Sequence, residues 1–560
     1  MEHNPVYVAY TWVMDIVAPF IVIGALWGII RRYIIRPPRL KGQQTVEALI
    51  ILITVLIHPV THVGKIATQI AGGQPPAGLG MATPPLSTAL SHLYTAASAE
   101  PWHIFWFWSH WGFVLVVLGI IGYTRYLHMV AGLLNDLFRR EPPRGLPERI
   151  NLDDPATFGT ARVDNFTRKQ LLDSISCVVC GYCQEACPAT STGKVLNPRL
   201  IIRDIKTNLL KSGPLLLRKQ APAIPLIGGG QEGSIPEAAL WACTTCGACM
   251  EVCPVYIEHV GEIIEMRRYL VQMEARFPEE LLGLFENTEQ RSNPWGIAPA
   301  DRAKWAAGID ARPFEAGKTE YLFYVGCAGA FDARSRLVTL SVARILDAAG
   351  ISWGILGRDE PCCGDSLRRL GNEYIFDRMA KENIRLFQER GVSRIITECP
   401  HCYHTLKNDY RQYGVEWEVI HHTELISNLL REGRLKLNGR QDLGNVVFHD
   451  SCYLGRHNGV YQAPREAVRL ATGRAPTEME RHHSRGFCCG AGGGRMWMEE
   501  GEGTRINIAR TEEALSKDPG TICVCCPYCL TMFEDGLKDK KATERVRVLD
   551  VAEIVAGALE

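Results

Sequence analysis

Two dense cysteine motifs combine residue types and spacing that indicate metal chemistry. "CVVCGYCQEACP" begins at Cys177 and "CTTCGACMEVCP" begins at Cys243, and both follow the pattern C-x2-C-x2-C-x3-C-P. In this ferredoxin pattern three thiolates of one tight loop hold a [4Fe–4S] cubane, and the fourth cysteine ligates the other cluster. Zinc is the alternative, but a closed zinc site takes four ligands from two knuckles. The motifs therefore predict two cubanes.

The crossed ligation pattern assigns eight cysteines to the two cubanes. The ligands predicted for the first cluster are Cys177, Cys180, Cys183 and Cys253. The ligands predicted for the second cluster are Cys243, Cys246, Cys249 and Cys187. Two adjacent cubanes form a path for electrons, because iron–sulfur cores are redox-active and zinc is not.

A second cysteine pattern occurs twice in the C-terminal half. "EPCCGDS" and "RGFCCGAGGGRMW" each contain adjacent cysteines, which do not easily form a disulfide because bridged residues lie on converging, separate backbones. The first copy consists of Cys327, Cys362, Cys363, Cys399 and Cys402. The second copy consists of Cys452, Cys488, Cys489, Cys526 and Cys529. Corresponding cysteines are 125 to 127 residues apart, which indicates an internal duplication. Cys523 and Cys525 are left over, and we expect them to be buried bystanders.

Short apolar strands lead into the first and last cysteines of each copy, as in "EYLFYVGC" and "RIITECPHC", and helices such as 375–390 and 505–516 follow. Loops beyond the carboxyl ends of such strands converge on one crevice, so the five cysteines of a copy should meet. Five thiolates exceed the needs of a cubane and suit a cluster in which some thiolates bridge two irons. The glycines after Cys489 would let the backbone wrap closely around it. A nucleotide-binding loop is the alternative, but the stretch lacks the Lys-Ser/Thr of a P-loop.

The first 140 residues have the composition of a membrane domain. Apolar stretches at 8–30, 46–66 and 102–126 each approach the length of about 20 residues that spans a bilayer as a helix. Five Lys and Arg residues crowd into "RRYIIRPPRLK", and none occurs between residues 66 and 124. Because basic residues favour the cytoplasmic side, we expect the N-terminus and the loop 66–101 outside. Everything after the third helix is then cytoplasmic, in a multi-pass protein of the cell inner (cytoplasmic) membrane.

Histidines in membrane helices are costly and usually functional. His110 and His128 are 18 residues apart, which on one continuous helix places them on a shared face about 27 Å apart. On the second helix, His58 and His62 are one turn apart, and His62 comes to the level of His110. A haem b between these helices is geometrically possible, with His62 favoured over His58. The alternatives are hydrogen bonds across helices, an interfacial His128, or a second haem completed by a partner.

Length and composition agree with a multidomain protein. The chain has 560 residues, no net charge and 20 cysteines, none of them before residue 177. Nucleic acid is not an expected partner, and clustered thiolates indicate metal ligation in a reducing compartment. We predict a membrane domain with three transmembrane helices at 1–145 and an α-helical di-cluster ferredoxin domain at 150–295. Two duplicated α/β cysteine-rich domains follow at 315–435 and 440–560.

These motifs resemble known families. The two five-cysteine repeats resemble the cysteine-rich (CCG) domains of heterodisulfide reductase, which implies a noncubane [4Fe–4S] cluster in each complete motif. Iron–sulfur subunits of glycolate and lactate oxidation share the arrangement. Residues 100–560, with "ARVDNFTRKQLLDSISCVVCGYCQEACPA", "YVGCAGAFDARSR", "EVIHHTEL" and "GFCCGAGGGRMWMEE", resemble more closely the membrane-bound electron-transfer flavoprotein:menaquinone oxidoreductases. That resemblance implies a haem b membrane part in which His110 and His128 match the paired histidines of the last helix. This chain has three apparent spans where that family has five or more, so the number of haems stays open.

The prediction that follows is a membrane-anchored oxidoreductase. Electrons enter the five-cysteine domains from a soluble donor, an electron-transfer flavoprotein by resemblance, and pass through the cubanes toward haem b and a membrane quinone. The expected cofactors are two cubanes, one or two noncubane clusters, haem b and quinone. One alternative is a disulfide/thiol oxidoreductase like heterodisulfide reductase, with the opposite electron flow. Another is an iron–sulfur relay subunit of a larger complex, whose quinone site lies in a further membrane subunit. A homodimer is also open.

Overall fold

The computed structural model describes residues 5–40, 46–73, 83–141, 143, 145–155, 158–437 and 441–559. It divides into two compact units. The first comprises Met1–Leu134 with Ile175–Gly181, and the second comprises Asn135–Ser174 with Tyr182–Glu560. Lys41, one of the basic residues used above for orientation, and positions 74–82 of the predicted outer loop lie outside the described residues.

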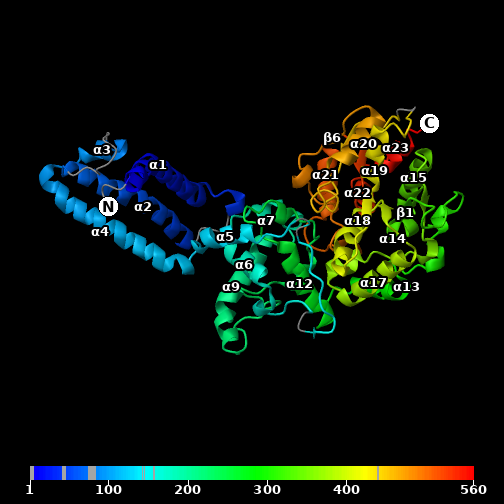
Figure 1. The fold of residues 1–560 in the computed structure, drawn as a ribbon, viewed down its shortest axis with the longest axis horizontal. Helices are drawn as coiled ribbons and strands as arrows, with labels where there is room; N and C mark the ends of the chain where they lie inside the picture. The colour runs from blue at the N-terminus through cyan, green and yellow to red at the C-terminus, as the bar shows by residue number, and fades with distance from the viewer. Residues whose placement is uncertain are drawn as a thin grey trace. The chain divides into compact units, whose positions relative to one another are not determined.

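Three long helices make up most of the first unit: α1 (Pro5–Ile29), α2 (Val46–Ala71) and α4 (Ala96–Ile120) (Figure 1). The segments Val8–Ile35, Val46–Ala71 and Ala96–Ile120 are long and apolar enough to cross a membrane. The sequence predicted three spans, and three helices among the described residues have the length and apolar composition that a span needs.

The third helix begins and ends about six residues earlier than the predicted 102–126. A capping box starts it, because the Thr95 side chain accepts a hydrogen bond from the Ser98 backbone N–H. At its other end the Thr124 hydroxyl donates to the Ile120 carbonyl at 3.0 Å, and a new helix, α5 (Leu127–Leu137), follows. His128 therefore lies on α5, whereas His110 lies on α4. The prediction that both share one helical face was wrong, because it assumed an uninterrupted helix.

Two acidic residues of the first unit, Asp15 and Glu47, find their partners in the same unit. Asp15 accepts hydrogen bonds from the backbone N–H groups of Leu86 (2.7 Å) and Ser87 (2.9 Å) and from the Ser87 hydroxyl, at the start of α3 (Pro85–Ser91). Glu47, at the start of α2, forms an ion pair with Arg125 at 3.0 Å. Because Arg125 follows the end of α4, this pair links the start of α2 to the end of α4.

The α-helical domain that carries the ferredoxin motifs belongs mostly to the second unit, but residues 175–181, with Cys177 and Cys180, are assigned to the first. Its helices are α6 (Arg168–Ser176), α7 (Tyr182–Ala186), α8 (Pro188–Ser191), α9 (Pro198–Leu217), α10 (Glu237–Trp241), α11 (Ala248–Glu251), α12 (His259–Gln272) and α13 (Glu280–Arg291). The short helices α7 and α11 carry the third cysteine of each motif, Cys183 and Cys249. This agrees with the predicted helical di-cluster domain.

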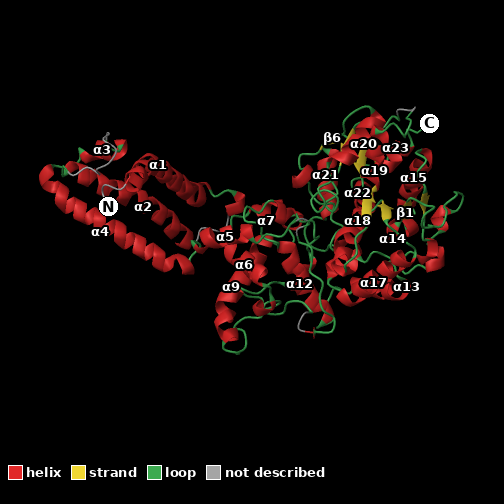
Figure 2. Cartoon of the chain, in the orientation of Figure 1, coloured by secondary structure: helices red, strands yellow, loops and turns green. Residues whose placement is uncertain are grey.

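Two four-stranded parallel sheets follow, shown as yellow strands among red helices in Figure 2. The strand orders are β2-β1-β3-β4 and β6-β5-β7-β8. The first sheet consists of β1 (Tyr321–Tyr324), β2 (Trp353–Gly354), β3 (Arg394–Thr397) and β4 (Glu418–His421). The second consists of β5 (Val446–Phe448), β6 (Thr477–Glu478), β7 (Thr521–Val524) and β8 (Arg547–Asp550). The identical order of the two sheets agrees with the predicted duplication.

Helices surround each sheet. Those of the first repeat are α14 (Gly326–Phe331), α15 (Ser335–Ala348), α16 (Asp365–Leu370), α17 (Glu373–Glu389), α18 (Pro400–His404) and α19 (His422–Arg431). Those of the second are α20 (Gln462–Thr472), α21 (Ile506–Leu515), α22 (Pro527–Asp539) and α23 (Val551–Ala556). The two repeats pack against each other through α15 with α23 and α19 with α20. The predicted helices at 375–390 and 505–516 correspond to α17 and α21.

Candidate iron–sulfur centres

The four cysteines predicted for the second cubane come together inside the second unit. Cys187, Cys243, Cys246 and Cys249 are all buried, and the Thr245 N–H donates to the Cys243 sulfur at 3.4 Å. Burial and then the neighbouring thiols of Cys243 and Cys187 hold the pKa of Cys249 well above its usual range. Several thiolates this close and this buried need a compensating positive charge. The iron atoms of a cluster would supply that charge, so the residues fit the predicted cofactor.

The four cysteines predicted for the first cubane are divided between the units. Cys177 and Cys180 belong to the first unit, whereas Cys183 and Cys253 belong to the second. Within the first unit the Val179 N–H donates to the Cys177 sulfur at 3.3 Å. Within the second, the Ile257 N–H donates to the Cys253 sulfur at 3.5 Å. This ligand set stays a prediction from the motif.

The first repeat brings its five cysteines to one cavity. Cys327, Cys362, Cys363, Cys399 and Cys402 all line it, at the carboxyl ends of β1 and β3 and before α16. This is the convergence expected of loops that follow parallel strands. Burial and the neighbouring Cys362 thiol hold the pKa of Cys327 well above its usual range. The cavity therefore offers five crowded donors suited to an iron–sulfur core.

A buried arginine stands beside this cavity. An Nη atom of Arg302 lies 3.5 Å from the Cys327 sulfur and 3.0 Å from a Glu360 carboxylate oxygen. Glu360 in turn accepts hydrogen bonds from the backbone N–H groups of Val325 at 3.1 Å and Gly326 at 2.9 Å. Arg302 partly offsets the negative charge of bound thiolates. It was not predicted, because it lies in the connector before the repeat and carries no motif of its own.

The second repeat also brings its cysteines together. The sulfur atoms of Cys489 and Cys529 are 3.4 Å apart, and the Cys488 thiol contacts Cys452 of the same repeat. Cys488 also contacts Cys246, a predicted ligand of the second cubane. The buried Arg456 lies beside these thiols, which raise the pKa of its guanidinium. The second five-cysteine site thus adjoins a ferredoxin site directly.

The glycine-rich loop after Cys489 has a use that the sequence did not predict. A Cβ atom added at Gly492 would lie 2.5 Å from the Thr244 carbonyl oxygen, and one added at Gly493 would lie 2.5 Å from the Cys243 carbonyl oxygen. The predicted close approach of backbone is therefore present, but it brings the loop against the ferredoxin loop. Arg267 fixes this contact by donating to the carbonyl oxygens of Cys243 at 2.7 Å and Gly493 at 3.0 Å.

The two repeats exchange side chains at their cysteine sites. His401, from the CPHC motif of the first repeat, contacts Cys526 of the second. Its Nδ1 lies 2.8 Å from an Asp365 carboxylate oxygen, and its ring stacks on Tyr453 at 4.1 Å between centroids. Tyr528, from the CPYC motif of the second repeat, lines the cavity of the first. Each repeat thereby helps to enclose the site of the other.

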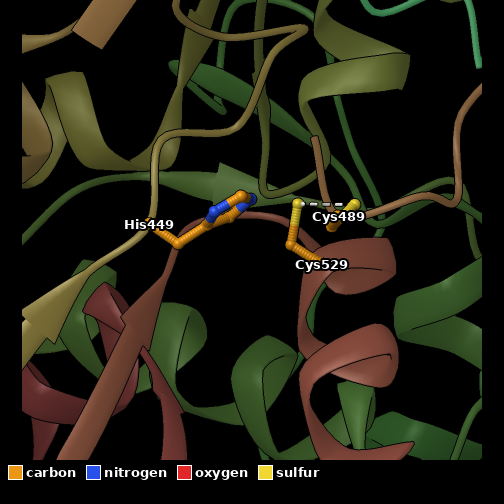
Figure 3. A group of neighbouring side chains, drawn as sticks. All are labelled: His449, Cys489 and Cys529. Carbon is orange, nitrogen blue, oxygen red and sulfur yellow. Dashed lines mark hydrogen bonds between the residues drawn. The ribbon is translucent and has the colours of Figure 1, made fainter. Parts of the chain in front are cut away.

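The remaining histidines near the repeats have distinct surroundings. His421 Nε2 lies 3.2 Å from the Glu398 carbonyl oxygen, and His422 Nε2 lies 2.9 Å from an Asp550 carboxylate oxygen, so both are hydrogen-bonding neighbours. A ring nitrogen of His449 and the sulfur atoms of Cys489 and Cys529 lie within 4.8 Å of one another (Figure 3). Burial and the nearby Arg510 hold the pKa of His449 well below its usual range, which keeps the imidazole neutral.

The two leftover cysteines come just before the last motif of the second repeat, and Cys525 directly precedes Cys526. Cys523 is part of β7, and both Cys523 and Cys525 are fully buried. Their burial agrees with the expectation, and their role as bystanders stays a prediction.

Within the first unit, histidines of α2 and α4 face each other. The ring centroids of His62 and His110 are 5.7 Å apart, and those of His58 and His110 are 5.1 Å apart. His110 Nδ1 lies 3.0 Å from the Thr61 hydroxyl oxygen. That hydroxyl donates its own proton to the carbonyl of Ile57 or His58, which favours the His110 tautomer with its proton on Nδ1 and none on Nε2. His62 Nε2 is buried with no hydrogen-bond partner among the described residues.

The fold and its cysteine sites define a class: a membrane-anchored iron–sulfur oxidoreductase. Residues 173–257 match the family described as "4Fe-4S dicluster domain", and residues 321–407 and 446–534 match "Cysteine-rich domain". The chain is 37% identical to the "EtfAB:quinone oxidoreductase" of Syntrophomonas wolfei, over 99% of this chain and 83% of that protein. It is equally similar to the "Probable iron-sulfur-binding oxidoreductase FadF" of Bacillus subtilis, over 99% and 84%. The chain belongs to the family of EtfAB:quinone oxidoreductases, as its motifs predicted.

A further relative covers a smaller part of the chain. One component of the "Dihydromethanophenazine:CoB--CoM heterodisulfide reductase" of Methanosarcina acetivorans is 30% identical over 70% of this chain and 96% of that protein. This likeness agrees with the predicted resemblance of the repeats to heterodisulfide reductase.

Proposed function

We propose that this oxidoreductase carries electrons from a soluble flavoprotein donor to a quinone in the membrane. The observation that carries the proposal is the continuity of thiol groups within the second unit. The first five-cysteine site shares His401 and Tyr528 with the second, and the second contacts Cys246 of the predicted second cubane. When bound, noncubane and cubane [4Fe–4S] clusters would supply one-electron carriers at these groups. The protein's own residues bury them and exclude water between them.

The donor and the acceptor are assigned from the relatives. The printed name "EtfAB:quinone oxidoreductase" describes the Syntrophomonas protein, and we extend both halves of it to this chain. Electrons then enter at the five-cysteine sites from an electron-transfer flavoprotein and leave through the membrane domain. With the N-terminus outside, the iron–sulfur domains lie in the cytoplasm, where such a donor is found. Menaquinone is the acceptor by family resemblance.

The membrane domain supplies candidate sites for haem b and quinone. We assign His62 and His110 as the axial ligand pair, because the buried His62 Nε2 has no partner among the described residues and the two rings face each other; His58 is the alternative to His62. His128, on a separate helix, is left for a second haem or an interfacial role. An apolar pocket next to these helices is lined by residues including Pro19, Pro59, Gly64, Leu90, Tyr94 and Trp106. Its apolar lining with one phenol suits a quinone ring.

The test uses the purified full-length chain in lipid nanodiscs. Reduced electron-transfer flavoprotein and a menaquinone analogue are added anaerobically, and quinol formation is followed by absorbance. We expect turnover in the wild type, and the Cys488→Ser variant should take up electrons without forming quinol. Redox difference spectra of the wild type and of His110→Met test whether His110 ligates haem b. Absence of quinol formation by a chain with full iron content would refute the proposal and favour a relay subunit that needs a partner.

A second candidate function is disulfide reduction at the five-cysteine sites. The likeness to the Methanosarcina heterodisulfide reductase component, which is matched over 96% of its length, favours it. Electrons would then flow from the membrane toward the repeats. Assaying the same nanodiscs with a quinol as donor and a low-molecular-weight disulfide as acceptor separates the two functions.

A further inference from the structure

The two five-cysteine sites differ at the position three residues before their first cysteine. His449 precedes Cys452 by three residues, and Tyr324 precedes Cys327 by three residues, so the two occupy equivalent places at the ends of β5 and β1. The Tyr324 hydroxyl donates to the Pro361 carbonyl at 2.6 Å, so its proton is already used by the backbone. The ring of His449 points toward the sulfurs of Cys489 and Cys529 (Figure 3).

The hydrogen bonding of His449 determines which ring nitrogen carries its proton. Arg510 Nε–H donates to His449 Nδ1 at 3.2 Å. Nδ1 must therefore be an acceptor without a proton, and a neutral imidazole then carries its proton on Nε2. A protonated imidazolium would set two N–H groups against each other at this contact. Arg510 itself is fixed by an ion pair with Glu513 at 2.8 Å.

The other ring nitrogen of His449, Nε2, carries an N–H group whose hydrogen bond is unused. Nε2 is fully buried and has no hydrogen-bond partner among the described residues, and the whole side chain is 1% exposed. A buried N–H without a partner is costly, so such a group normally indicates an acceptor that binds there. The nearby acceptors of the predicted site are sulfur atoms.

We propose that the His449 Nε2–H donates a hydrogen bond to a sulfur of the iron–sulfur cluster in the second repeat, and that it raises the reduction potential of this cluster. The inference rests on the proposed function only in assigning a cluster to the second repeat. Hydrogen bonds to sulfur are among the factors that set such potentials, because they stabilise the more negative, reduced core. One electron enters, no covalent bond forms or breaks, and the proton stays on Nε2. His449 is thus a positioning and tuning residue and not a sixth ligand.

The location gives this tuning a role in electron flow. The tuned site is the one whose Cys488 contacts Cys246 of the predicted second cubane. A higher potential there favours the arrival of electrons at the repeat that adjoins the ferredoxin domain. No equivalent donor is offered by Tyr324 in the first repeat, because its proton is directed to Pro361.

The test compares His449→Phe with the matched variant Tyr324→Phe in the full-length protein, using potentiometric titration followed by EPR. We expect His449→Phe to weaken one-electron reduction of a single noncubane centre about tenfold, which corresponds to a fall of about 59 mV in its midpoint potential. Tyr324→Phe should leave that centre unchanged. If His449→Phe loses the cluster, its iron and sulfide content will show the loss. A second measurement, made on the wild-type protein, then tests the hydrogen bond without any variant.

The wild-type protein is labelled with 15N-histidine and transferred to D2O for pulsed EPR. A hydrogen bond predicts a weak nitrogen coupling and an exchangeable deuteron coupled to the same centre. A strong coupling typical of nitrogen bound to iron would overturn the proposal, and so would no coupling with an unshifted potential in His449→Phe. Iron and sulfide sufficient only for the two cubanes would show that the second repeat holds no cluster, and would overturn that assignment as well. A full iron and sulfide content without the expected coupling would overturn the hydrogen bond alone.

Discussion

Replacing Gly492 by alanine tests the contact between the glycine loop and the ferredoxin loop. The new methyl carbon would lie 2.5 Å from the Thr244 carbonyl oxygen, where ordinary contacts begin near 3.4 Å. The loops must therefore separate by about 0.9 Å, and overpacking of this kind costs about 1–3 kcal/mol. Gly492 does not have a positive φ, so the effect isolates the steric contact from backbone strain.

The assay is bleaching of the cluster absorbance on heating, measured as a half-life. A loss of about 2 kcal/mol shortens the half-life by up to about thirty-fold, since each 1.4 kcal/mol is a factor of ten. Gly501→Ala is the matched control, because a Cβ there meets no atom within 4 Å. Equal half-lives for Gly492→Ala and Gly501→Ala would refute the reasoning that the loops are held in contact at this point.

Three other predictions concern the buried charges and the leftover thiol of Cys523. Arg369→Met should destabilise the fold by about 3–5 kcal/mol, because it leaves the buried Asp409 without one of its arginine partners; adding Asp409→Asn should restore part of the yield of folded protein, and no restoration would argue against the pairing. Glu262 is fully buried, no described residue hydrogen-bonds its carboxylate oxygens, and burial holds its pKa well above the usual range. The unfolded chain loses this proton near pH 4.3, whereas the folded chain keeps it. Between about pH 4.3 and the raised pKa of folded Glu262, the free energy of unfolding should therefore fall by about 1.36 kcal/mol per pH unit. Glu262→Gln should therefore raise the melting temperature at pH 8 and leave it unchanged at pH 4, and a lower melting temperature at pH 8 would contradict the assignment. Cys523→Ala should keep the full iron and sulfide content with a loss of about 1 kcal/mol in stability, whereas Cys526→Ala should lose iron; equal iron loss in both would make Cys523 a ligand.

Most of the architecture could be predicted because its signals are local. The strands β1, β3, β5 and β7 are short apolar runs that end at cysteines, and their pattern is visible without any tertiary information. The edge strands β4 and β8 were missed, since "EVIH" and "RVLD" are only half buried and mix apolar with charged residues. The third membrane helix was misplaced because apolar residues continue past Ile120, where a threonine hydroxyl and not a change of polarity marks the end.

The candidate site was predictable in its ligands and not in their surroundings. Cysteine spacing is fixed by cluster chemistry and can be read from a single sequence. Arg302, Arg267 and Arg510 act through contacts with residues 24 to 226 positions away in the chain, and arginines occur throughout it. No spacing rule connects them with the cysteines. The same holds for His449, whose importance comes from an arginine 61 residues later.

The exchange of His401 and Tyr528 between the repeats has a consequence for biogenesis. Neither repeat can enclose its cysteine site completely while the other is still being synthesised, because each repeat contributes a side chain, His401 or Tyr528, to the site of the other. Oxygen-sensitive metal groups inserted early would stay open to solvent until translation of the last motif is finished. Cluster insertion into either repeat is therefore expected to be complete only when both repeats have folded.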